Sequence, residues 1–541
     1  MTWKRSSFMA AVMGAGLLVA TDALAADWPS AGADLSNSRY QSKESKINAN
    51  NVGSLQLKWT LDTSGDVQAH PAVDGNYLYF PDSAGWLYKV DKTTGALIWK
   101  RQISDYTGLA GDSARGTPAV AGNLLILGNL IGRNIPLFGQ PPAPPQPARV
   151  FAVDKVTGNP VWSTKVDETD LSYVTQSPIV YKDTAYVGVS AGEELFSALV
   201  PKANWNWTFR GSVLALDVKT GAIKWQTFVI PPRPANWNGN WYSGAGIWGS
   251  TGSIDKENNQ IFMATGNNTS APQSAIDCLK TQPTASSCLD PANYFDSVIA
   301  LDLDTGKINW GARGLPNDVY AVACGLSVPG LDFVPPFFPG IYDNCPYVNP
   351  PPDEGQPPTK RDPDWDFAQG PMLLGSDLVG AGQKSGVFWA FKRKTGQLVW
   401  ATQAVPGGIT GGMQWGSATD DTRIFVASSN SGSGKPGGPG PGPGGWRALD
   451  RKTGAVIWTT PDPIGSRAEG AVSAANNVVF GCNLAGRMYA MDARTGAILW
   501  EYNSGGPCNA GASISDGMVY WGSGNFSGFP GTPKKVFAFG L

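Results

Sequence analysis

The sequence predicts an all-β protein, an eight-bladed β-propeller that is closed by pairing of its N- and C-terminal strands. Two observations predict this fold: a phrase ending in Trp recurs along the chain, and each end of the chain carries half of a further copy. The phrase contains alternating apolar residues, a charged turn, Thr-Gly and, after a short gap, Trp. Its seven complete copies end at Trp99, Trp162, Trp225, Trp310, Trp400, Trp458 and Trp500.

Each phrase is typical of a β-hairpin. The alternating residues form one strand, Thr-Gly supplies a turn in which Gly can take a positive φ, and the next strand carries Trp on its packing face. Two strands cannot bury both faces alone, and the 42-residue interval from Trp458 to Trp500 suits a four-stranded propeller blade. Longer intervals elsewhere indicate insertions. We therefore expect the repeated Trp residues to build the blades rather than to perform chemistry.

The two ends of the chain predict how the ring closes. Residues 536–541 resemble the first strand of the phrase without its Trp strand, and residues 55–59, which end in Trp59, resemble the missing strand. Pairing of the two completes an eighth blade and removes the exposed sheet edges that would favour aggregation. We therefore expect residues 27–541 to form one propeller domain.

The first residues resemble a secretory signal peptide. Lys4 and Arg5 precede an apolar run over residues 8–20, and small residues at 23–26 offer a cleavage site. A membrane anchor is the alternative, but the run is short for a span. Residues 1–26 are thus predicted to be a signal peptide, which implies a periplasmic protein with no membrane span in the mature chain.

Charge and cysteine content restrict the partners and the compartment. The 41 Lys and Arg residues nearly balance the 43 Asp and Glu residues, so no basic surface for nucleic acid is expected. The six cysteines form three sequence-near pairs and suit an oxidising compartment. The pairs, only one of several possible connectivities, are Cys278 with Cys288, Cys324 with Cys345, and Cys482 with Cys508.

Three insertions are predicted on loops. Residues 139–149 and 432–445 are rich in Pro and Gly, so we expect surface connections there. The segment from Cys324 to Asp364 contains several aromatic residues and is either a lid over a pocket or a further connection.

The chain has few residues that could perform chemistry. His70 is the single histidine, which argues against a histidine-built zinc or iron centre, and no Cys-x-x-Cys-His motif offers covalent haem attachment. Because His70 precedes Pro71 in a strand-like segment, we interpret it as a packed or hydrogen-bonded residue. No dinucleotide or phosphate-binding glycine motif is found.

Four motifs on separate blades remain, and they could converge on the propeller axis. They are VSAGEE at 189–194, ATGNN at 264–268, PDWDF at 363–367 and GQKSG at 382–386. Their carboxylate and amide oxygens suit a hard cation such as Ca²⁺. Each motif is weak alone, because such residues also cap turns.

These motifs and two further segments resemble the quinoprotein alcohol dehydrogenases. These enzymes are eight-bladed propellers that bind pyrroloquinoline quinone (PQQ) with a divalent cation. The resemblance spans the mature chain, and DPDWDF followed by GAGQKSGVFWAF is similar to the polyvinyl-alcohol dehydrogenase branch in particular. Its other supports are WPSAGADLSNSRYQ at 28–41 and FRGSVLALD at 209–217.

The resemblance implies a metal site and a catalytic base. Glu193, Asn267 and Asp366 match the cation ligands of the family, and Glu194 competes with Glu193 because the two adjoin. Asp366 also matches the family's catalytic aspartate. In the family this carboxylate takes the alcohol proton while hydride passes to the quinone carbonyl carbon, which the cation polarises. Asp364 is interpreted as a turn-capping residue.

The resemblance also implies the residues that contact the cofactor. Lys384 matches the cation placed against the quinone oxygens, where its charge would stabilise a developing oxyanion. Trp248 matches the floor beneath the flat cofactor, and Arg115 matches an arginine that pairs with a cofactor carboxylate. The expected wall or polar contacts are Gln68, Thr175, Ser190 and Trp415.

Two departures from the family refine this expectation. Leu109 and Ala110 stand where methanol-oxidising relatives have a disulfide between adjacent cysteines, so the pocket should be more open and suit a bulky secondary alcohol or polyvinyl alcohol. Ala368 stands where lanthanide-using relatives have a second Asp, which favours Ca²⁺. Electrons should leave to a separate acceptor, a periplasmic cytochrome c as in the family.

Two alternatives stay open. The same fold and cofactor would serve another small or aromatic alcohol. A propeller built from the same phrase could instead be a non-catalytic scaffold that holds protein partners.

Overall fold

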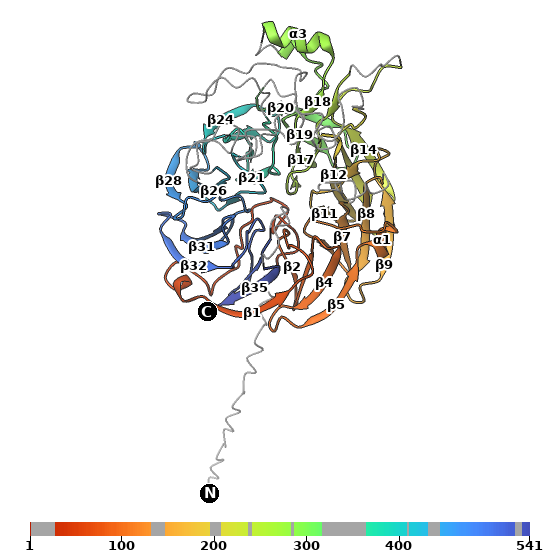
Figure 1. Ribbon diagram of the computed structural model, residues 1–541. Coiled ribbons are helices and arrows are strands. Elements are labelled where there is room, and N and C mark those ends of the chain that lie inside the picture. Colours follow the sequence, from red (N-terminus) through yellow and green to blue (C-terminus); the bar gives the residue numbers. More distant parts are fainter. Residues whose placement is uncertain are drawn as a thin grey trace, which may run out of the picture.

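Eight β-sheets form a ring in the computed structural model (Figure 1). It describes residue 1 and residues 27–130, 146–194, 207–235, 241–282, 286–315, 364–407, 411–430, 444–524 and 533–541. Each blade has four antiparallel strands, and the first strands of several neighbouring blades contact one another around the axis. The predicted eight-bladed propeller is therefore confirmed.

The first four blades follow the chain in order. Blade 1 contains β2 (Ala72–Asp74), β3 (Tyr77–Pro81), β4 (Trp86–Asp91) and β5 (Leu97–Gln102). Blade 2 contains β6 (Ala119–Ala121), β7 (Leu124–Gly128), β8 (Arg149–Asp154) and β9 (Pro160–Lys165). Blade 3 contains β11 (Ile179–Tyr181), β12 (Thr184–Ala191), β13 (Ser212–Asp217) and β14 (Ile223–Phe228), with β10 (Ser172–Tyr173) paired to the end of β12. Blade 4 contains β16 (Ser253–Asp255), β17 (Gln260–Ala264), β19 (Ser297–Asp302) and β20 (Ile308–Arg313).

The other four blades complete the ring. Blade 5 contains β21 (Met372–Leu374), β22 (Leu378–Gly382), β23 (Val387–Lys392) and β24 (Leu398–Gln403). Blade 6 contains β25 (Ala418–Thr419), β26 (Arg423–Ser428), β27 (Gly445–Asp450) and β28 (Val456–Pro461). Blade 7 contains β29 (Ser473–Ala475), β30 (Val478–Cys482), β31 (Arg487–Asp492) and β32 (Ile498–Asn503). Blade 8 contains β33 (Ser513–Ser515), β34 (Met518–Gly522), β35 (Lys535–Gly540) and β1 (Gln56–Asp62).

The short elements lie between these strands. They are η1 (Val52–Ser54), α1 (Ser104–Thr107), α3 (Gln273–Thr281), η4 (Ser286–Cys288) and a two-stranded sheet of β15 (Ser243–Gly244) and β18 (Asn268–Ser270). No helix within the described ranges is both long and apolar enough to cross a membrane.

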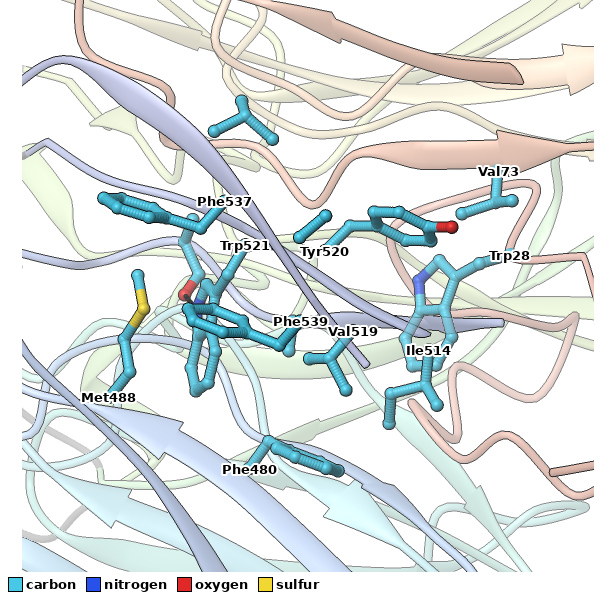
Figure 2. Close-up of a cluster of buried hydrophobic side chains, with 14 of the residues drawn as sticks. Trp28, Val73, Phe480, Met488, Ile514, Val519, Tyr520, Trp521, Phe537 and Phe539 are labelled. Atoms are coloured by element: carbon cyan, nitrogen blue, oxygen red, sulfur yellow. Dashed lines mark hydrogen bonds between the residues drawn. The ribbon is translucent and has the colours of Figure 1, made fainter. Parts of the chain in front are cut away.

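The ends of the chain close the ring as predicted. Strand β1 pairs antiparallel with β35, so that Trp59 lies opposite Ala538. Figure 2 shows the buried cluster behind this closure, in which Phe537 and Phe539 lie near Trp521. The same cluster includes Trp28 from the N-terminal segment. Burial of these aromatic side chains stabilises the join between the two ends.

The recurring phrase links each blade to the next. The indole N–H of Trp162 in blade 2 donates to the carbonyl of Val218 in blade 3 at 2.9 Å. Gly221 of the blade 3 turn has φ 72°, and a Cβ there would lie 2.4 Å from Cε3 of Trp162. Gly is thus required both by the turn and by the Trp packed on it. The same Trp–Gly pairing joins Trp59 to Gly95, Trp99 to Gly158, Trp225 to Gly306, Trp310 to Gly396, Trp400 to Gly454 and Trp458 to Gly496.

An aspartate fixes the turn in most of these phrases. In blade 6, Oδ1 of Asp450 accepts hydrogen bonds from the backbone N–H and the hydroxyl of Thr453, at 2.8 and 2.9 Å. These bonds lower the pKa of Asp450. Blade 5 has Lys392 at the equivalent position. Its Thr395 hydroxyl accepts from the N–H of Gln397, a bond that Thr453 of blade 6 also makes, with Ala455.

Two of the three predicted disulfides are present. Cys278–Cys288 ties α3 to η4 in an insertion of blade 4, and Cys482–Cys508 joins blade 7 to the segment that leads into blade 8. The predicted pair Cys324–Cys345 lies outside the described residues. So do the predicted signal peptide, residues 324–363 of the possible lid, and most of the two Pro- and Gly-rich loops.

Candidate active site

Most of the predicted site residues occupy equivalent positions in successive blades. Six of them precede the first strand of blades 1 to 6: Gln68, Arg115, Thr175, Trp248, Asp366 and Trp415. Glu193, Asn267 and Lys384 follow the second strands of blades 3, 4 and 5, and Ser190 lies near the end of β12. In antiparallel blades, the start of the first strand and the end of the second lie at the same end of the axis. The fold therefore gathers residues that are far apart in the sequence.

Asp366 is the centre of this group and is 4% exposed. Its Oδ2 accepts hydrogen bonds from the indole N–H of Trp248 at 2.9 Å and from the ammonium of Lys384 at 3.1 Å. Its Oδ1 accepts from the backbone N–H of Asn267 at 2.5 Å. A Cβ on Gly266 would lie 2.6 Å from Oδ1 of Asp366. The glycine of the ATGNN motif therefore allows the backbone to lie close to this carboxylate.

Lys384 contacts a second carboxylate. Its ammonium lies 2.6 Å from Oδ1 of Asp364, which sequence reasoning treated only as a turn-capping residue. Burial raises the pKa of Asp364 to about 7, although Lys384 opposes this rise. Burial alone would lower the pKa of Lys384, but the charges of Asp364, Asp366 and Glu194 raise it. Lys384 therefore remains cationic at neutral pH between two buried aspartates.

Aromatic rings extend the site from blade 4 to blade 6. The rings of Trp248 and Trp415 meet edge to face with centroids 5.4 Å apart, and the guanidinium of Arg115 lies 3.4 Å from the centroid of Trp415. The ammonium of Lys384 lies 5.0 Å from the centroid of Trp248. The hydroxyl of Thr175 donates to the backbone carbonyl of Trp248 at 3.2 Å. The arrangement forms a cationic, aromatic surface beside Asp366.

The two adjacent glutamates have different environments. The carboxylate of Glu193 accepts hydrogen bonds from the backbone N–H groups of Thr208 and Phe209, at 2.9 to 3.1 Å. Burial raises the pKa of Glu193 despite these bonds. Glu194 instead contributes to the charge environment of Lys384. Glu194, the competing residue, therefore acts electrostatically on Lys384, whereas Glu193 is anchored to the backbone before β13.

A cavity of about 40 Å³ lies beside this group. Four predicted cofactor contacts line it: Gln68, Arg115, Thr175 and Trp415. Residues that sequence reasoning did not assign to the site also line it, among them Arg39, His70 and Asn509. The predicted packing of His70 is consistent with its burial and its stacking on Trp28, at 6.2 Å between centroids.

One sequence signal could have found Asn509. It lies four residues before β33, as Gln68 lies four residues before β2 and Arg115 four residues before β6. Glu469 has the same position before β29, and its Oε1 accepts a hydrogen bond from the indole of Trp415 at 3.3 Å. Selecting the residue four positions before each first strand would therefore have added Glu469 of blade 7 and Asn509 of blade 8 to the site.

A second pocket, of about 550 Å³, lies between blades 2 and 3. None of the predicted site residues lines it. Thr208 does line it, and the hydroxyl of Thr208 donates to Glu193 at 2.5 Å. This pocket therefore adjoins the glutamate pair but is separate from the group around Asp366.

Family models match both halves of the chain. A model described as the glucose/ethanol/alcohol dehydrogenase β-propeller domain, named for PQQ, matches residues 28–322, which is more than half of the chain. A second model, described as the outer membrane protein assembly factor BamB, matches residues 383–526. The second match falls on blades 5 to 8.

Known proteins are similar over most of the chain. A polyvinylalcohol dehydrogenase of a Pseudomonas species is 26% identical, over 92% of this chain and 73% of its own length. A protein of the same name from Sphingopyxis sp. strain 113P3 is 27% identical, over 92% and 72%. The crystal structure of the quinohemoprotein alcohol dehydrogenase from Comamonas testosteroni superposes with a TM-score of 0.66 and 21% identity, over 95% of this chain and 80% of that one. The last likeness supports the fold alone.

Proposed function

This chain belongs to the glucose/ethanol/alcohol dehydrogenase β-propeller family, and we propose that it is a PQQ- and Ca²⁺-dependent dehydrogenase of secondary alcohols or polyvinyl alcohol. The observation that carries the proposal is the environment of Asp366. A buried carboxylate held by Trp248, Lys384 and the backbone of Asn267 is suited to accept a proton from a bound alcohol.

The residues around the small cavity fit a flat, anionic cofactor. Arg115 supplies charge, Gln68 and Thr175 supply polar contacts, and Trp248 supplies an aromatic face beside Lys384. Gln68 has a buried Oε1 without a partner among the described residues, which suits a polar ligand. When bound, PQQ would supply the carbonyl carbon that accepts hydride.

The acidic and amide groups fit a hard cation. Asp366, Asn267 and either Glu193 or Glu194 offer the oxygen donors that Ca²⁺ prefers. Within the described ranges no group of three His, Cys, Asp or Glu side chains forms a metal site, so an amide oxygen is part of the proposed set. The bound ion would supply Lewis acidity. Between the glutamates, Glu194 has the stronger support because Glu193 is held by Thr208 and Phe209.

The side chains around Asp366 would have separate roles in the transfer of the alcohol proton. Asp366 accepts the hydroxyl proton, and the donors from Trp248 and Asn267 fix the direction of its oxygens. Lys384 supplies a fixed positive charge where negative charge develops. Asp364 holds the ammonium of Lys384 at 2.6 Å and so positions it without contacting substrate.

The substrate and acceptor are proposed from the relatives and the sequence. Two relatives are named polyvinylalcohol dehydrogenases, and Leu109 and Ala110 are at least partly exposed where a cysteine pair would cover the cofactor. Without a haem attachment motif, the protein would pass electrons to a separate cytochrome c in the periplasm. Its signal peptide would direct it there, and residues 27–541 would act as one domain.

The test of this function is alcohol-dependent dye reduction by Asp366→Asn and Asp366→Ala in the presence of PQQ and Ca²⁺. We expect kcat to fall by about 10²- to 10⁴-fold with little change in Tm, because the base is lost while the blades stay intact. Asp377→Asn is the matched control, since Asp377 is an exposed aspartate of the same blade. Full activity in both Asp366 variants would contradict the proposed mechanism.

A second candidate is a non-catalytic scaffold for protein partners. The BamB match over residues 383–526 favours it. Such a scaffold would neither bind PQQ nor reduce a dye, so the same assay separates the two functions. Comparison of kcat/KM across alcohols would separate polyvinyl alcohol from a small or aromatic substrate.

A further inference from the structure

The cavity beside Trp415 carries two positive charges. Arg39 and Arg115 both line it, and no aspartate or glutamate is among its described lining residues. Arg115 was expected there from the sequence, whereas Arg39 comes from the N-terminal segment that precedes blade 1. A cavity wall that carries two arginines, one of them fully buried, indicates a site for an anion.

Arg39 is fully buried. Its Nη1 donates to Oδ1 of Asn37 at 2.6 Å, and its Nη2 lies 3.4 Å from the carbonyl of Trp415. Its Nε has no hydrogen-bond partner among the described residues. Burial lowers the pKa of Arg39 to about 10, which leaves the guanidinium charged at neutral pH.

Asp34 is the acidic residue that acts on the charge of Arg39, and it forms no ion pair with the guanidinium. The carboxylate of Asp34 accepts hydrogen bonds from Ser36 and Ser38. No ion pair joins Arg39 to a carboxylate within the described ranges. Because a buried charge without a counter-ion is costly, a bound anion would stabilise this arrangement.

The backbone around the guanidinium is shaped to admit it. A Cβ on Gly416 would lie 2.4 Å from Cζ of Arg39, and Gly416 has φ 144°. Any other residue at this position would collide with the arginine head and strain the backbone. Glycine at position 416 therefore leaves room next to Trp415 for the guanidinium of Arg39.

Three other polar atoms that line the cavity are buried without a partner among the described residues. They are Oε1 of Gln68, Nε2 of His70 and Oδ1 of Asn509. Rotation of either amide would present N–H donors, and a neutral imidazole can donate from Nε2. Burial, followed by the charge of Arg39, lowers the pKa of His70, so the ring is neutral. The cavity, at about 40 Å³, is the size of one or two waters or a carboxylate group.

We propose that Arg39 and Arg115 form a two-arginine subsite that binds one carboxylate group of an aromatic ligand. The proposal rests on the proposed function in one respect, because PQQ is an aromatic tricarboxylate. It adds Arg39, which no feature of the sequence assigned, as a second residue for anion recognition. Gln68, His70 and Asn509 supply the neutral donors around the same carboxylate group.

The test is titration of the cofactor-free protein with PQQ and, separately, with trimesate, a benzene tricarboxylate. Binding is followed by calorimetry and by quenching of Trp fluorescence. We expect Arg39→Met to weaken both ligands by about tenfold or more, because a charged hydrogen bond is lost, and Arg39→Lys to weaken them less. Arg210→Met is the matched control, since Arg210 lies over Phe228 in the other pocket.

A second readout separates binding from a structural role. Without ligand, Arg39→Met should keep or raise Tm, because it removes an unpaired buried charge. A lower Tm of Arg39→Met together with wild-type affinity in Arg39→Lys would make Arg39 a structural residue and overturn the proposal. Equal PQQ affinity in wild type and Arg39→Met would also overturn it, while the proposed function would stand.

The binding of trimesate and the binding of PQQ need not occur together. Binding of trimesate that depends on Arg39, without any binding of PQQ, would support the subsite and contradict the proposed cofactor. If wild type bound neither compound, both the subsite and the cofactor would be wrong.

Discussion

The ammonium group of Lys384 lies 3.1 Å from Oδ2 of Asp366, the carboxylate to which we assign proton transfer. The same ammonium lies closer still, at 2.6 Å, to Asp364. One buried cation therefore serves two buried carboxylates, and its removal would leave them side by side without a counter-ion.

We predict that Lys384→Met lowers kcat/KM by about 10²- to 10³-fold, because the fixed charge for the developing oxyanion is lost. It should also lower Tm, since the two aspartates lose their cation. Lys384→Arg, which retains the charge, should keep Tm and recover part of the activity. Wild-type kcat/KM in Lys384→Met would show that the charge has no part in the reaction.

The two glutamates should respond differently to amide substitution. Glu194→Gln should raise the Ca²⁺ concentration needed for half-maximal activity by about tenfold or more, because one anionic ligand is lost. Glu193→Gln should lower Tm, because its carboxylate binds the backbone of Thr208 and Phe209. Activity titrated with Ca²⁺ and calorimetry measure the two effects. A metal effect confined to Glu193→Gln would reverse this assignment.

The aspartate turn of blade 6 should show a pH-dependent contribution to stability. Thr453→Ala removes a donor to Asp450 and should cost about 1 kcal/mol more than Thr395→Ala in blade 5, where Lys392 replaces the aspartate. Because the folded pKa of Asp450 is lowered, this stabilisation is present above the ordinary pKa of Asp, 3.8, and is lost as pH falls through the lower folded value. Denaturant unfolding of both variants from neutral to acidic pH measures it. An equal cost in the two blades at neutral pH would contradict it.

The disulfide between blades 7 and 8 should stabilise the propeller. Replacing Cys482 and Cys508 together by Ser should lower the free energy of unfolding by about 3 kcal/mol, because the 26-residue loop is no longer closed in the unfolded chain. Replacing Cys278 and Cys288 is the control, since that pair closes an insertion outside the strands of blade 4. If the control lowered global stability by more, the inter-blade disulfide would not have this role.

The fold was predictable because one local pattern recurs with a fixed geometry. The Trp of one blade and the Gly of the next meet in space, as Trp162 and Gly221 do, so the packing that builds the ring is written as a recurring pattern. The terminal strands were predictable for the same reason, since Trp59 completes the phrase begun at the other end of the chain.

The site was less predictable, because its contacts join separate blades. The motifs named Asp366 and Lys384, but only the fold shows that Asp364 shares the same ammonium. Similarly, Glu193 and Glu194 cannot be distinguished by spacing, and their environments differ through Thr208, which lies before β13. No sequence pattern indicated Arg39 as a site residue, because its proposed role depends on the space beside Gly416.

The most direct test of the central claim is dye-linked alcohol oxidation by the mature protein, with and without added PQQ and Ca²⁺, on a secondary alcohol and on soluble polyvinyl alcohol. We predict that turnover requires both additions and that Asp366→Asn lowers kcat by about 10²- to 10⁴-fold. Saturable binding of PQQ without oxidation of either alcohol would contradict the proposed substrates, and the absence of any binding would contradict the dehydrogenase itself and favour a scaffold.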